Sequence, residues 1–186
     1  MSVQFIRHRF TVDDFHAMVE AGALKEDDRV ELIEGEVVEM MPIGLRHAAA
    51  VNMLTRWLVT GCGLRAIVQV QGPLHLGPDS EPQPDLLLLR PRDDFYRTRP
   101  ATADDVLLLI EVADSSLLYD RTIKLPLYAR AGLAEVWVID LVRDEVEMHR
   151  DPSPSGFRSS ERRGRGAHLI PAAFADLSLP ISEVLG

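Results

Sequence analysis

The chain has 186 residues, of which 46% are hydrophobic and 26% are charged, which is ordinary for one globular domain with a substantial core. The formal net charge of −9 argues against a protein that coats nucleic acid with a general basic surface. It does not exclude a site in which a metal ion supplies the positive charge. The single cysteine, Cys62, excludes an internal disulfide and a metal–thiolate cluster.

Two features that would indicate a membrane or secreted protein are missing from the sequence. No apolar run approaches the roughly 20 residues that cross a membrane. The first residues, MSVQFIRHRF, have no apolar core of the kind a secretory signal needs. We therefore expect a cytoplasmic protein without membrane partners. We expect one domain over residues 1–186, with its core at about 11–150 and a mobile, Ser-, Pro-, Gly- and Arg-rich loop at about 151–166.

A helix and a hairpin are predicted in the N-terminal part. Thr11 is suited to cap the helix, and Gly22 is suited to end it. The runs RVELI and EVVEMM flank Glu34-Gly35, which indicates a hairpin that turns on the glycine. Apolar side chains recur at helical spacing over residues 47–60 and predict a second helix.

The rest of the chain alternates predicted strands with one helix. Residues 106–112 form a continuous apolar run, typical of a strand at the centre of a sheet that is covered on both faces. A right-handed crossover between parallel strands is expected from there to residue 140. The fold class is therefore α/β, with a mixed central sheet flanked by helices. Further strands are predicted at 65–70, 73–76, 85–89 and 135–140, a helix at 117–131, and an edge hairpin at EVEMHR.

Carboxylates stand where such a sheet would place a site. Asp85 opens a predicted strand directly after Pro84, which fixes the chain direction. Glu111 lies near the end of the central apolar strand, where open α/β sheets tend to build their sites. A solvated or capping role explains most single acids, but an unpartnered charge within an apolar strand is costly. With Glu31 as a candidate third acid, these hard oxygen donors suit Mg²⁺ or Mn²⁺.

Lys124 and Tyr128 are four residues apart and should share one helix face. A lysine beside two carboxylates can orient a water or bind a phosphate as a point charge. Two plainer readings stay open. Lys124 could form a surface pair with Asp120, worth only about 0.3–0.5 kcal/mol, and Tyr128 could simply pack. Because Pro126 lacks an N–H, the helix is expected to start or kink near it.

Basic residues gather in two places. Each group could border a phosphate track or could lie in solvated loops. The groups are Arg90, Arg92, Arg97 and Arg99, and Arg158, Arg162, Arg163 and Arg165.

Other chemistries lack their motifs. No histidine–cysteine cluster supports zinc, and no Gly-x-x-x-x-Gly-Lys segment supports nucleotide hydrolysis. Ser115 and Ser116 are not in a nucleophile elbow, so a serine hydrolase is set aside.

Five segments together resemble the Uma-two family, bacterial proteins assigned as endonucleases of the PD-(D/E)XK superfamily. The segments are ELIEG, the histidine that opens the next helix, the PD pair, IEVADSS, and D-x-x-x-K-x-x-x-Y followed by AGLAEVWVID. The resemblance runs from about Thr11 to Asp140. It implies an α/β/α core with a mixed sheet, a Mg²⁺-type site and phosphodiester hydrolysis.

The resemblance also assigns residues. Asp85 matches the aspartate of the PD motif and Glu111 the acid of the second motif. The lysine usual two positions later is missing, because Ala113 stands there, and Lys124 on the following helix fills the role. The resemblance implies Asp85, Glu111 and Glu31 as metal ligands, and Lys124, Tyr128 and His47 as further site residues.

Two hypotheses of function follow. The first is a metal-dependent endonuclease, with DNA expected over RNA. The second is a catalytically silent module that keeps the nuclease fold and binds nucleic acid or protein, which the net acidity favours. The intact set of Asp85, Glu111 and Lys124 favours the enzyme. The edge hairpin and the apolar EVWVID segment also permit a homodimer, in which two sites would suit duplex cleavage.

Overall fold

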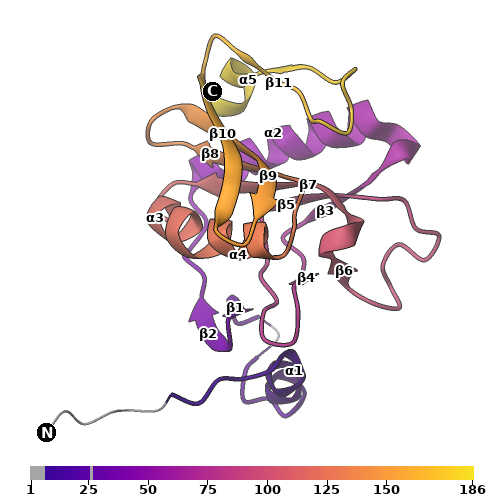
Figure 1. The fold of residues 1–186 in the computed structure, drawn as a ribbon, viewed down its shortest axis with the longest axis vertical. Helices are drawn as coiled ribbons and strands as arrows, with labels where there is room; N and C mark the ends of the chain where they lie inside the picture. The colour runs from indigo at the N-terminus through magenta and orange to yellow at the C-terminus, as the bar shows by residue number, and fades with distance from the viewer. Residues whose placement is uncertain (1–6, 26) are drawn as a thin grey trace, which may run out of the picture.

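The computed structural model describes residues 7–25 and 27–186 (Figure 1). Residues 1–6, part of the segment considered for a secretory signal, lie outside the described residues, as does residue 26. In chain order the elements are α1 (Val12–Glu20), β1 (Val30–Ile33), β2 (Glu36–Glu39), α2 (Leu45–Cys62), the 3₁₀ turn η1 (Gly63–Arg65), β3 (Ile67–Val70), β4 (Leu74–His75), β5 (Leu86–Leu89), β6 (Ala101–Thr102), the 3₁₀ turn η2 (Ala103–Asp105), β7 (Val106–Ala113), α3 (Leu117–Tyr119), the π-helical turn η3 (Asp120–Lys124), α4 (Leu125–Arg130), β8 (Glu135–Asp140), β9 (Glu145–Ser153), β10 (Gly156–Gly164), β11 (His168–Leu169), β12 (Leu179–Pro180) and α5 (Ile181–Leu185).

A mixed six-stranded sheet organises the molecule, in the order β10-β9-β8-β7-β5-β3. β7 and β8 are parallel and are joined through α3, η3 and α4, as expected from the strand–helix–strand pattern. The other neighbouring strands of this sheet are antiparallel. The predicted α/β class with a mixed central sheet is therefore confirmed.

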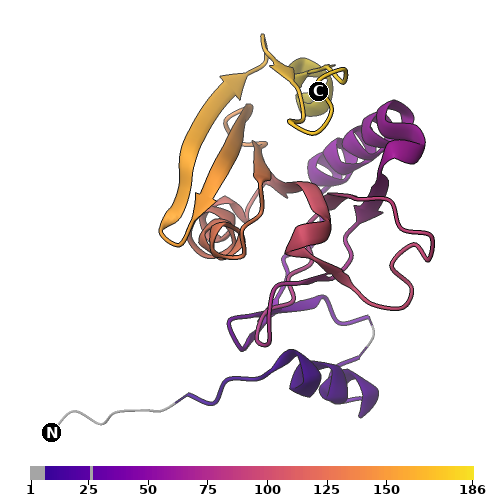
Figure 2. The same cartoon turned by 45° about the vertical axis from the view of Figure 1, so that its right-hand side comes forward.

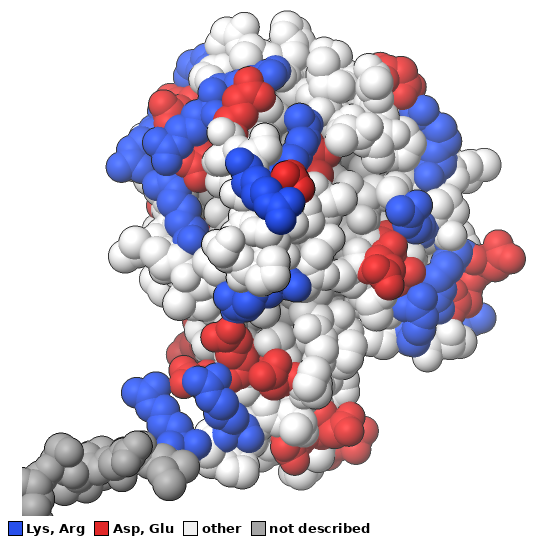
Figure 3. Space-filling view, viewed as in Figure 1, with Lys and Arg blue, Asp and Glu red and all other residues white. Residues whose placement is uncertain are grey.

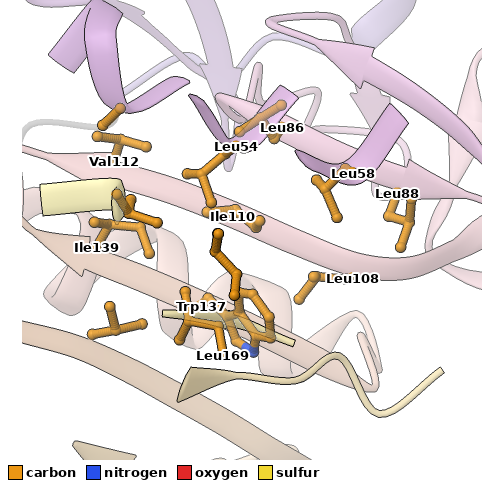
Figure 4. Close-up of a cluster of buried hydrophobic side chains, with 14 of the residues drawn as sticks. Leu54, Leu58, Leu86, Leu88, Leu108, Ile110, Val112, Trp137, Ile139 and Leu169 are labelled. Atoms are coloured by element: carbon orange, nitrogen blue, oxygen red, sulfur yellow. The ribbon is translucent and has the colours of Figure 1, made fainter. Parts of the chain in front are cut away.

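Hydrophobic layers cover both faces of the sheet. Alternate residues of a strand pack into different layers, because successive side chains point to opposite faces. Leu86 and Leu88 of β5 pack with α2 and α5 on one face (Figure 4). Leu87 and Leu89 pack with α4 on the other face. This two-sided burial explains why the strands read as continuous apolar runs rather than alternating ones. It also assigns Glu111, which lies between two residues of the α2 face, to the α4 face.

The N-terminal part folds as the sequence predicts. Thr11 caps α1 in a capping box with Asp14. β1 and β2 pair as an antiparallel hairpin whose turn residues, Glu34 and Gly35, have φ angles of 49° and 78°. A Cβ at Gly35 would lie 2.6 Å from the Cβ of Arg9, so the turn requires glycine. In Figures 1 and 2 this part lies beyond one end of the main sheet, on the side away from α5.

Helix α4 begins at Leu125 with Pro126 in its first turn, as expected, and a π-helical turn over Asp120–Lys124 precedes it. Leu125 donates its N–H to Asp120, five residues back, instead of to Arg121. Pro126 has no N–H to donate and its ring would clash with the carbonyl four residues earlier, so a wider turn relieves the helix there. This turn decides which way Lys124 points.

Residues 151–166 differ from the loop expected there. They complete β9 and form β10, which pairs with β9 through to Gly164. Serine and arginine side chains fit the exposed face of an edge strand, which is why the composition resembled a loop. β8, the EVWVID segment, is buried throughout between β7 and β9. That segment is therefore not exposed for pairing with a second chain, and β10 and β3 are the outer strands.

Among the described residues, no helix is both long enough and apolar enough to span a membrane.

Candidate active site

A cleft of about 630 Å³ lies where the β1–β2 hairpin, the ends of β5 and β7, the start of α2, and the α3–η3 segment meet. Five of the six site residues predicted from the sequence line this cleft. They are Glu31, His47, Asp85, Glu111 and Lys124. The sixth, Tyr128, lies in the core behind Glu111.

Glu111 is the centre of the cluster. Its side chain is only 4% exposed. Its Oε1 accepts from the hydroxyl of Tyr128 and lies 2.8 Å from the ammonium of Lys124. Its Oε2 accepts from the backbone N–H of Asp85 at 3.4 Å. Burial raises the pKa of Glu111 from 4.5 to about 8, although the charge of Lys124 acts in the opposite direction.

Lys124 joins two acids instead of forming the surface pair with Asp120. Its ammonium lies 2.8 Å from Glu111 and 3.4 Å from Glu31, and the residue is 5% exposed. Burial alone would lower the pKa of Lys124, but Glu111 and Glu31 outweigh burial and raise it. Lys124 therefore stays charged, and the π-turn at Asp120–Lys124 aims it at the sheet.

Asp85 is held by neighbours on three sides. Its carboxylate accepts from the N–H of Val112 at 2.9 Å and from the amide of Gln71 at 3.2 Å. His47, in the first turn of α2, places Nε2 at 3.0 Å. Burial alone would raise the pKa of Asp85, but the hydrogen bond and charge of His47 outweigh it and lower the pKa. The same hydrogen bond raises the pKa of His47, so the two side chains form an ion pair when His47 is protonated.

Glu31 is fixed by groups that the sequence did not single out. Its Oε2 accepts from the backbone N–H of Gln83 at 3.0 Å, and its Oε1 from the hydroxyl of Tyr119 at 3.3 Å. Tyr119 is five residues before Lys124, so a 3.6-residue period places the two on different faces. The π-turn brings the hydroxyl of Tyr119 and the ammonium of Lys124 to the same carboxylate, that of Glu31. The hydrogen-bond donor at Gln83 is backbone, which no side-chain motif reveals.

Asp120 is a fourth buried carboxylate in the cleft, considered from the sequence only as a surface partner of Lys124. It accepts from the hydroxyl of Ser116 at 2.7 Å and is 4% exposed. Burial raises its pKa, and the charge of Lys124 only partly offsets this. The cluster thus holds four carboxyl groups against one lysine and one histidine.

We predict that Tyr128→Phe lowers the free energy of unfolding by about 1–3 kcal/mol, because it removes a donor from a buried carboxylate. Tyr128 is 0% exposed and its hydroxyl bonds to Glu111. Urea unfolding at unchanged m-value measures the loss. The matched control is Tyr119→Phe, which removes a longer bond, 3.3 Å, to Glu31 from a half-buried ring. Equal small losses in both variants would contradict support of Glu111 by Tyr128.

The carboxyl groups of the cleft offer the oxygen ligands that a divalent cation such as Mg²⁺ takes. No group of three or more His, Cys, Asp and Glu side chains in residues 7–25 and 27–186 is arranged to hold a metal ion. Asp85 and Glu111 nevertheless both line the cleft, joined by the hydrogen bond from the backbone of Asp85, and both offer hard carboxyl oxygens. Mg²⁺ commonly uses only one or two protein carboxylates and completes its shell with waters and substrate phosphate. These two residues therefore fit such an ion.

The chain thus combines a mixed α/β fold with a buried cluster of carboxyl groups and one lysine in its cleft. Residues 12–182 match the Uma2 family model, described as "Putative restriction endonuclease". The chain belongs to this family, as the sequence motifs predicted.

A solved structure supports the same fold. It is described as a "putative nuclease belonging to DUF820 from Anabaena variabilis", and the superposition has a TM-score of 0.71. The two chains share 19% identity, and the match covers 95% of this chain and 97% of that one. No curated protein matches this chain.

Proposed function

We propose that the chain is a metal-dependent endonuclease that hydrolyses phosphodiester bonds of nucleic acid, with DNA as the expected substrate. Membership of the Uma2 family and the nuclease fold support the broad nuclease-like function. The observation that carries the proposal is the approach of Lys124 to Glu111, at 2.8 Å beside Asp85. The second motif usually has a lysine two residues after its acid, where this chain has Ala113. In this proposal Lys124, from a separate helical segment, takes the role of that lysine.

Each side chain has a role that follows from its contacts. Asp85 and Glu111 would hold a Mg²⁺ or Mn²⁺ ion, which supplies a water of lowered pKa and charge to offset the phosphate. His47 orients the carboxylate of Asp85. Lys124 presents its ammonium to the attacking water or to a phosphate oxygen.

Glu31 and Tyr128 orient the ammonium of Lys124 and the carboxylate of Glu111. Both oxygens of Glu31 already accept hydrogen bonds, from Gln83 and Tyr119. The ammonium of Lys124 lies 3.4 Å from Oε2 of Glu31, so we propose that Glu31 positions Lys124. Contact between Glu31 and a metal, directly or through water, stays a prediction. A homodimer also stays a prediction, with the outer strands β10 and β3 as the available edges.

The proposal is tested by calorimetric titration with Mn²⁺ and Mg²⁺, together with nicking of supercoiled plasmid DNA. We expect metal binding and nicking in the unchanged protein, both suppressed by chelator. Glu111→Gln should weaken metal binding by more than about 10-fold, because a carboxylate ligand becomes a neutral amide. Glu183→Gln, an exposed residue of α5 outside the cleft, is the control and should bind metal as the unchanged chain does.

The outcomes separate the two hypotheses of function. Binding and nicking that are lost together in Glu111→Gln would support the enzyme. An unchanged chain that binds neither metal and cuts no nucleic acid would contradict the enzyme and favour the silent binding module.

A further inference from the structure

The apolar rim of the cleft is left unexplained by the hydrolytic residues. Met41 and Ile43 belong to the segment between β2 and α2, and Leu118 belongs to α3. All three line the cleft and remain 60%, 40% and 75% exposed. Apolar side chains that gather at a cleft and stay exposed mark a binding surface. This rim lies in the same cleft as Asp85 and Lys124. A ligand that covers the rim is therefore close to these two side chains.

The charges of the cleft are poorly suited to a long run of phosphates. Two lining side chains are permanently cationic among the described residues, Arg29 and Lys124. Lys124 is engaged by Glu111, and Arg29 donates to the carbonyl of Met41 at 2.9 Å. The lining carboxylates outnumber them, and are Glu31, Glu39, Asp85, Glu111, Asp114 and Asp120.

The two arginine clusters do not supply a phosphate track either. On the face that Figure 3 shows, blue side chains lie beside red ones. Duplex DNA carries about one charge per 1.7 Å of its axis, and proteins that follow it match several of these charges. The ion pairs of the clusters are Arg92–Asp94, Arg99–Asp105, Arg158–Asp151, Arg162–Glu147, Arg163–Glu161 and Arg165–Asp144.

We propose that the cleft takes an unpaired nucleotide, so that the substrate class is single-stranded or locally unpaired nucleic acid. The base lies against the rim of Met41, Ile43 and Leu118, and the adjoining phosphate lies at the cluster of Asp85, Glu111 and Lys124. An unpaired base offers a flat, weakly polar face that pairing and stacking hide in a duplex. Base contact then supplies the affinity that a basic track supplies elsewhere. This inference rests on the proposed nuclease function.

The test compares three substrates of one sequence with Mn²⁺ present: a single strand, a blunt duplex, and a duplex with a central unpaired bubble. We expect the single strand to be cut at least about tenfold faster than the duplex. Cuts in the bubble substrate should fall within its unpaired segment. A blunt duplex cut as fast as the single strand would overturn the inference and leave the proposed hydrolysis standing. No cleavage of any substrate would instead overturn the proposed function, and this inference with it.

A pair of variants tests the rim itself. Leu118→Asn keeps the size of the side chain and adds no charge, and we expect it to raise KM for the single strand about tenfold with little change in kcat. Leu64→Asn is the matched control, because Leu64 is 98% exposed and lies outside the cleft. It should cut as the unchanged protein does. Equal KM values for the two variants would overturn the contact between base and rim.

Discussion

Replacing Asp85 with asparagine is expected to reduce metal-dependent cleavage by more than about 100-fold. The change keeps the shape of the side chain and removes one of the two adjacent carboxylates that fit a divalent cation. Loss of partners that only support a metal ligand already costs about 10–100-fold, so loss of a ligand should cost at least as much. Initial rates of plasmid nicking over a range of Mn²⁺ concentrations measure the effect.

A matched control separates chemistry from folding. Asp93→Asn makes the same chemical change on an exposed residue outside the cleft, and it should leave the rate unchanged. Asp85→Asn should also unfold cooperatively in urea, because an amide oxygen can still accept from Val112. If Asp85→Asn keeps the rate of the control at all Mn²⁺ concentrations, Asp85 is not a metal ligand in the reaction.

Replacing Lys124 with methionine is expected to lower the free energy of unfolding by about 3–5 kcal/mol, because it leaves buried carboxylates without their cation. Glu111 and Glu31 are 4% and 1% exposed, so solvent does little to screen them. Cleavage should be lost as well, since the proposed phosphate-facing charge is removed. Urea unfolding measures the stability change.

The loss in Lys124→Met should be larger near pH 9 than near pH 5. The pKa of Glu111 is raised from 4.5 to about 8, so between these values the folded chain binds more protons than the unfolded chain. The stability that Glu111 contributes is therefore present at low pH and falls as pH rises through this window. Without Lys124 the pKa of Glu111 rises further, so the fall continues to higher pH.

The control for this pH dependence is the only other lysine of the sequence, Lys25, which is exposed. Lys25→Met should change stability by less than about 0.5 kcal/mol at either pH. A Lys124→Met protein as stable as Lys25→Met at both pH values would show that Lys124 does not neutralise the buried acids.

The sequence predicted the N-terminal helix, the hairpin, the buried central strands and the parallel crossover. Each depends on local rules, such as the cap at Thr11, the turn at Gly35 and continuous apolar runs in doubly covered strands. Residues 151–166 were not predictable in this way. Serine, glycine and arginine are compatible with a loop and with an exposed edge strand, and only pairing with β9 decides between them.

The sequence by itself predicted that Asp85 and Glu111 lie close together, because both stand at strand positions that a sheet of this class brings together. Only the tertiary structure decided where Lys124 points. A regular helix follows a 3.6-residue period, whereas Pro126 is accommodated by a π-turn that directs Lys124 to Glu111 and places Tyr119 on Glu31. Charge balance in the cleft was likewise decided by folding. The net charge of the sequence counts every charged residue equally. In the folded chain, burial removes some carboxylates from solvent, and ion pairs neutralise most of the clustered arginines.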